Sequence, residues 1–65
     1  MFDLNYNKSS KIAEFTKMSG RPFMYFGQMS EAQAQQILGE LNSAKDNGTT
    51  PGEIKEKYDL DMELL

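Results

Sequence analysis

The chain has 65 residues, no Cys, no His and a formal net charge of −3. That length allows one small domain, residues 1–65, whose thin core has to be supplemented by close packing or by association with another chain. The missing Cys and His exclude disulfide bonds and triads that depend on a histidine base, and they remove the commonest ligands of zinc and haem. We therefore expect no enzyme, no metal and no cofactor.

The charge is distributed unevenly along the chain. Residues 1–27 carry a net charge of +2, whereas residues 28–65 carry −5. This acidic half argues against binding to nucleic acid, because such binding depends on neutralising phosphates with Lys and Arg. No run approaches the roughly 20 apolar residues of a membrane span, and the N-terminus lacks the pattern of a secretory signal. A cytoplasmic location is the resulting expectation.

The first twenty residues predict a strand followed by a helix. In the segment 1–6, apolar Phe2, Leu4 and Tyr6 alternate with polar Asp3 and Asn5, which is the period of a half-buried strand. Ser9 or Ser10 is suited to cap a helix. Three apolar residues then recur at a spacing of three, and the helix is expected to end by Ser19, before Gly20. They are Ile12, Phe15 and Met18.

A second strand is predicted at Phe23–Phe26, where Phe, Met, Tyr and Phe follow one another. Pro22 and Gly27 bound this run. A short continuous apolar run of this kind is typical of a strand that is buried on both faces. Cover by a partner protein is the other interpretation.

The strongest local signal predicts a helix over residues 31–45. Ser30-Glu31-Ala32-Gln33 is a capping box. In this motif the Ser hydroxyl accepts a hydrogen bond from the backbone N–H three residues later, and the Gln side chain accepts one from the backbone N–H of the Ser. Asn47-Gly48 is a typical helix end. Gly39 is costly inside a helix and predicts the close approach of another backbone. One face of the helix is apolar: Ala34, Ile37, Leu38, Leu41 and Ala44.

A second box, Thr50-Pro51-Gly52-Glu53, predicts a short helix that continues to about Tyr58. Residues 60–65 alternate apolar and acidic side chains. That pattern fits either one more helical turn, capped by Asp61, or an extended segment.

These elements predict a small, α-rich α+β domain in the order strand, helix, strand, helix, helix. The two strands are expected to pair, with the helix over residues 31–45 packed across them. An all-α fold is the alternative if residues 1–6 form a loose arm.

For function, the composition favours a small acidic protein-binding module, such as an inhibitor, an adaptor or a minor assembly component of the kind found among phage or accessory proteins. Large aromatic and Met side chains supply much of the binding energy of protein interfaces. Seven aromatic residues are many for so short a chain, and the partner is expected to be another protein, either a different one or a second copy in a homodimer. The predicted partner-binding residues are Phe23, Tyr25, Phe26 and Met29 as apolar anchors, Arg21 in a fixed turn, and Asp59, Asp61 and Glu63 as acidic residues that steer toward a basic surface.

Two resemblances offer other interpretations. Residues 50–65 resemble the opening of a helix-turn-helix unit, which implies a DNA-binding regulator, although acidic residues occupy the expected recognition helix. The stretch from Met29 to Leu38 is similar to the helix opening of the small phycobilisome-degradation proteins. The break at Asn47-Gly48 departs from that family's long second helix, so we do not assign the chain to it.

Overall fold

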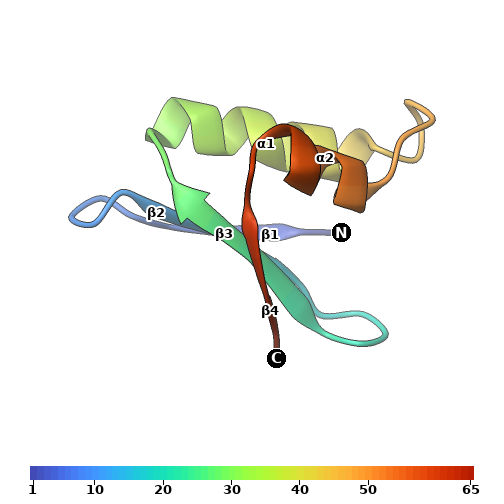
Figure 1. Ribbon diagram of the computed structural model, residues 1–65, viewed down its shortest axis with the longest axis horizontal. Helices are drawn as coiled ribbons and strands as arrows, with labels where there is room; N and C mark the ends of the chain where they lie inside the picture. Colours follow the sequence, from blue (N-terminus) through green and yellow to red (C-terminus); the bar gives the residue numbers. More distant parts are fainter.

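Four antiparallel strands and two helices make up the protein. The computed structural model describes all 65 residues. Its elements are β1 (Asp3–Asn7), β2 (Ile12–Lys17), β3 (Phe23–Gln28), α1 (Glu31–Ser43), α2 (Pro51–Lys57) and β4 (Asp61–Leu64). The strands lie in the sheet in the same order as in the sequence, and every neighbouring pair is antiparallel. Both helices lie on one side of this sheet (Figure 1).

This architecture corrects the predicted fold class. The domain is α+β with about 31% helix and 32% strand, so the α-rich expectation and the all-α alternative are both wrong. The predicted order of strand, helix, strand, helix, helix is wrong as well. Residues 12–17 form a strand where a helix was expected, and residues 61–64 add a fourth strand.

The serines that were expected to cap a helix instead close the turn between β1 and β2. The side-chain oxygen of Asn7 accepts hydrogen bonds from the backbone N–H groups of Ser9 (2.9 Å) and Ser10 (3.1 Å). Lys11 then takes a left-handed conformation with φ of +61°. Short polar side chains compete with the helix for backbone groups in this way, so the chain reverses direction here.

Alternation along β2 explains why the threefold spacing was misleading. Ala13 and Phe15 are fully buried, and Ile12, Glu14 and Thr16, which alternate with them, face the other side of the sheet. Ile12 and Phe15 are an odd number of positions apart, and therefore lie on opposite faces of a strand. Gly20, with φ of +68°, lies in the turn between β2 and β3 and not at a helix end.

The segment after α2 is extended. Asp59 takes a left-handed conformation with φ of +53°, and the chain then enters β4, which pairs with β3. Since Asp61–Leu64 is a strand, the helix-turn-helix interpretation of residues 50–65 has no second helix.

Local capping fixes the start of both helices. The Ser30 hydroxyl accepts a hydrogen bond from the N–H of Gln33 (3.2 Å), but the side-chain oxygen of Gln33 accepts none from the N–H of Ser30, so the box is only half formed. At Thr50 both halves of the capping box are present. An added Cβ at Gly39 would meet no atom within 4 Å, so the predicted close approach of another backbone is wrong.

The core lies between the helices and the sheet face that they cover. It contains no buried polar or charged residue. β2 and β3 contribute Ala13, Phe15 and Tyr25; α1 and its C-cap contribute Ala34, Ile37, Leu41 and Ala44; Phe2, Ile54 and Leu60 complete it.

Candidate protein-binding face

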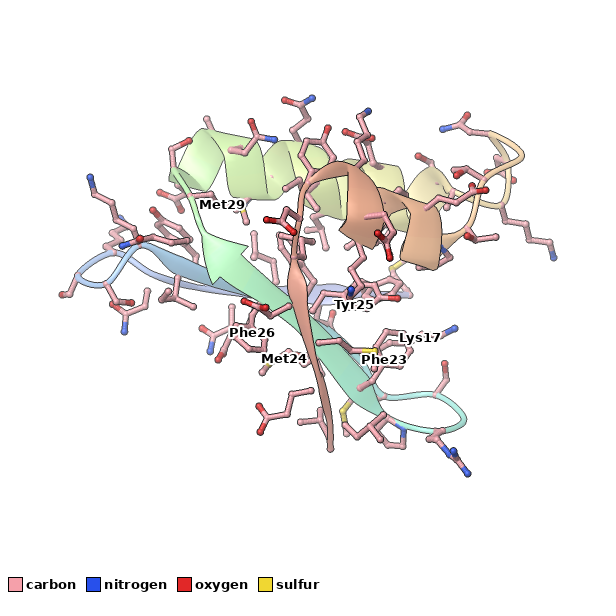
Figure 2. All side chains as sticks on the ribbon, in the orientation of Figure 1. Lys17, Phe23, Met24, Tyr25, Phe26 and Met29 are labelled. Atoms are coloured by element: carbon pink, nitrogen blue, oxygen red, sulfur yellow. The ribbon has the colours of Figure 1, made fainter.

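The alternation of β3 separates the predicted aromatic anchors onto two faces. Tyr25 is buried beneath the helices, and Phe23 is half-buried on the same face. Met24 and Phe26 occupy the positions between and beyond them, and therefore point to the opposite face. Figure 2 shows the labelled side chains leaving β3 in these two directions. A run predicted as one anchor therefore serves two purposes.

Phe23 and Tyr25 belong to an aromatic cluster with Phe2. The ring of Phe2 packs edge-on against Phe23 at 5.8 Å between centroids and stacks on Tyr25 at 5.9 Å. Phe23 and Tyr25 are 5.0 Å apart. Such pairs add to the energy of simple burial, and burial also raises the pKa of the Tyr25 hydroxyl above its ordinary value. These two residues primarily stabilise the fold.

The face of the sheet away from the helices has no covering element. Residues in register on antiparallel strands share a face, so the pairings define this surface, which we call the open face. One row across the sheet is Asn5, Glu14, Phe26 and Asp61; the next is Asp3, Thr16, Met24 and Glu63; a third is Asn7, Ile12 and Gln28.

Carboxylates flank the apolar residues of the open face. Phe26 lies between Glu14 and Asp61 in register, and Met24 lies beside Glu63. With Asp3, the face carries four acidic side chains and no Lys or Arg. None of the four is ion-paired, since the single salt bridge of the protein joins Lys57 to Glu40. The amide of Asn5 donates a hydrogen bond to the Glu14 carboxylate (3.3 Å). The open face therefore presents half-buried apolar groups in a negative field.

The structure brings together only part of the predicted site. Phe26, Asp61 and Glu63 share the open face. Asp59 lies in the turn before β4, and Arg21 is exposed in the turn between β2 and β3. Met29 is half-buried against the core, and its carbonyl accepts a hydrogen bond from the Tyr6 hydroxyl (2.8 Å).

Sequence reasoning missed four contributors to the open face: Asp3, Ile12, Glu14 and Met24. The alternation of apolar Ala13 and Phe15 with polar Glu14 and Thr16 was the sequence signal that would have found the two on β2. Assigning that segment to a helix hid it.

The largest surface depression borders the open face and shares Asn5, Asn7, Ile12 and Glu14 with it. This depression, about 560 Å³, lies beside the turn between β1 and β2 and is lined mainly by polar residues. No group of three acidic side chains is placed to hold a metal ion. Neither helix is long and apolar enough to cross a membrane.

A polar cluster ties α1 to α2. Glu40 accepts a hydrogen bond from the Tyr58 hydroxyl and forms a salt bridge with Lys57, at 3.2 Å between Nζ and Oε1. The Tyr58 hydrogen bond, supported by Lys57, lowers the pKa of Glu40 below its ordinary value of 4.5. The members belong to α1, to α2 and to the C-cap of α2, so this cluster is a link within the fold.

The cluster predicts how stability falls in acid. Because the pKa of Glu40 is lower in the folded state, its contribution is complete above about pH 4.5 and is lost as the pH falls through the folded pKa. Glu40→Gln is expected to lower the urea midpoint slightly at pH 7 and to leave the variant equal to the wild type at the lowest pH at which both fold. Urea denaturation from pH 7 to pH 3 measures this, with Glu31→Gln as the control at an exposed position. A difference that stays constant across that range would contradict the assignment.

Comparisons with protein-family models, with curated proteins and with solved structures found no match to the chain. The functional argument therefore rests on the geometry of the open face.

Proposed function

We propose that this protein is a small binding module that docks a basic surface of another protein on its open face. The observation that carries the proposal is the row formed by Glu14, Phe26 and Asp61, in which an aromatic side chain lies between two carboxylates that have no cation partner. A Lys or Arg side chain of a partner would pair with the carboxylates while its stem or guanidinium packs on the ring.

The surrounding residues support the same function. Met24 adds a flexible apolar side chain beside Phe26, and Ile12 is a diagonal neighbour of Phe26 on β2. Asp3 and Glu63 extend the negative charge to both edge strands. Charge of one sign around an apolar centre accelerates association with a partner of opposite charge and selects that partner.

The test uses paired baits in affinity capture from the native host. One bait combines Glu14→Gln, Phe26→Ser and Asp61→Asn on the open face. The matched bait combines Glu31→Gln, Leu38→Ser and Asp46→Asn, all away from that face. Tyr25 is left unchanged, because its removal would damage the core. Circular dichroism melts of each bait establish that it is folded.

A protein with a basic surface is expected to be retained by the wild type and by the matched bait, to be lost from the open-face bait, and to be released by added salt. The proposal fails if every retained protein binds the open-face bait as well as the wild type.

A further inference from the structure

The two edges of the sheet differ in how their backbone groups are satisfied. On the β1 side, Asn42 of α1 occupies both backbone groups of Phe2: the N–H of Phe2 donates to the amide oxygen (2.7 Å), and the amide nitrogen donates to the Phe2 carbonyl (3.3 Å). No strand pairs with the outer edge of β4. In Figure 1 this strand runs down from α2 and crosses in front of β3. The outer edge of β1 is thus anchored to α1 at Phe2, whereas the edge of β4 has no such contact.

The backbone of β4 presents hydrogen-bonding groups to this edge. The N–H of Leu65 donates to the carbonyl of Pro22 (3.1 Å), which continues the pairing with β3. N–H directions alternate along an antiparallel strand, so the amides of Met62 and Leu64 point away from β3. All residues of β4 are exposed. Their backbone groups are thus accessible to another strand.

The side chains of β4 are divided by chemistry between its two faces. Asp61 and Glu63 lie on the open face. Met62 and Leu64 lie on the other face, where they are 50% and 62% exposed. Leu64 is in register with half-buried Phe23, which extends the apolar surface inward from the edge. A strand that paired here would meet acidic groups on one face and apolar groups on the other.

Symmetry disfavours a second copy of this chain in the registers that centre on Met62 or Glu63, in the middle of β4. In a two-fold antiparallel pairing of β4 with itself, each residue lies opposite a residue of the same face. A register centred on Met62 places Asp61 opposite Glu63 of a second copy, and does so twice. A register centred on Glu63 places that carboxylate opposite its own equivalent. Like charges directly opposite each other destabilise strand pairing, and charged edges are a common protection against self-association.

We propose that β4 accepts an extended segment of the partner protein as a fifth strand, with Lys or Arg toward Asp61 and Glu63 and with apolar side chains toward Met62 and Leu64. This proposal rests on the binding function proposed above and specifies how the partner engages one margin of the open face. In strand addition the backbone hydrogen bonds provide affinity, and the alternate side chains provide specificity.

The test titrates the ¹⁵N-labelled protein with synthetic peptides. The probe alternates Lys and Val over eight residues, and its control has the same composition with all Lys before all Val. The alternating peptide is expected to shift the amide resonances of residues 61–65 and to slow hydrogen exchange at Met62 and Leu64. It is expected to bind several-fold more tightly than the block control.

Two variants separate backbone pairing from side-chain attraction. Met62→Pro removes an outward N–H while leaving the pairing with β3, and Met62→Ala shortens the same side chain but keeps the N–H. Binding is expected to fall several-fold more in Met62→Pro. Asp61→Lys combined with Glu63→Lys is expected to transfer the preference to a peptide that alternates Glu and Val.

The inference is overturned if the block and alternating peptides bind equally, if the probe protects β1, if neither peptide binds, or if Met62→Pro and Met62→Ala behave alike. It is also overturned if the protein alone sediments as a dimer with protected β4 amides, since a second copy would then occupy the edge.

If the paired baits reveal a partner that depends on the open face while the peptides fail, strand addition alone is wrong. If no such partner is found, the proposed function itself fails.

Discussion

Phe15→Ala is expected to leave most of the protein unfolded at 25 °C. Phe15 is fully buried at the centre of β2, with Leu4 and Tyr25 in register on either side. Truncating a buried Phe to Ala costs about 3–5 kcal/mol. A core of this size rarely supplies more than about 3–5 kcal/mol of net stability, so the substitution removes most of the margin. Far-ultraviolet circular dichroism and urea denaturation measure the loss.

Phe26→Ala is the matched control for that experiment. Phe26 lies on the next strand, one row away, but on the open face where it is only half-buried. The same truncation is expected to leave a cooperative transition with a moderately lower urea midpoint. If Phe15→Ala melts like Phe26→Ala, the assignment of the two faces is incorrect.

Asn42→Ala is expected to lower the free energy of unfolding by about 1–2 kcal/mol, because it leaves two backbone groups of a buried residue without their partner. Asn42 bonds both the N–H and the carbonyl of Phe2, which is itself part of the aromatic cluster. Asn42→Asp keeps the acceptor for the Phe2 N–H but loses the donor, so its effect is expected to be intermediate at pH 7.

The measurement for Asn42 combines urea midpoints with hydrogen exchange of the Phe2 amide. Exchange is expected to accelerate strongly in Asn42→Ala and less in Asn42→Asp. Unchanged exchange at Phe2 in Asn42→Ala would show that the side chain does not protect this edge.

The helices were predictable because their starts depend on neighbouring residues alone. Ser30 and Thr50 each cap a helix through a backbone N–H three positions later. The strands at residues 1–6 and 23–26 were also recognised from local pattern. In contrast, β2 was missed. Residues 7–10 are suited either to cap a helix or to form a turn centred on Asn7, and the pairing of β2 with β1 and β3 favours the turn.

The candidate site was only partly predictable for a related reason. Phe26, Asp61 and Glu63 were named from composition and charge, but their proximity depends on the pairing of β3 with β4, segments separated by both helices. Tyr25 and Phe23 were assigned to the same surface because a continuous apolar run does not show which face each residue takes. The register of the sheet determines that, and register is a property of the whole fold.

The late position of β4 has a consequence for synthesis of the chain. Residues 3–28 form a contiguous three-stranded meander of neighbouring contacts, which favours rapid formation. Until residues 61–64 leave the ribosome, β3 is an edge strand, unpaired on its outer side, that exposes the uncharged run Phe23–Phe26. Such a strand is a template for intermolecular aggregation. Once β4 pairs with β3, the apolar run is no longer at the edge, and the new edge strand carries the negative charges of Asp61 and Glu63.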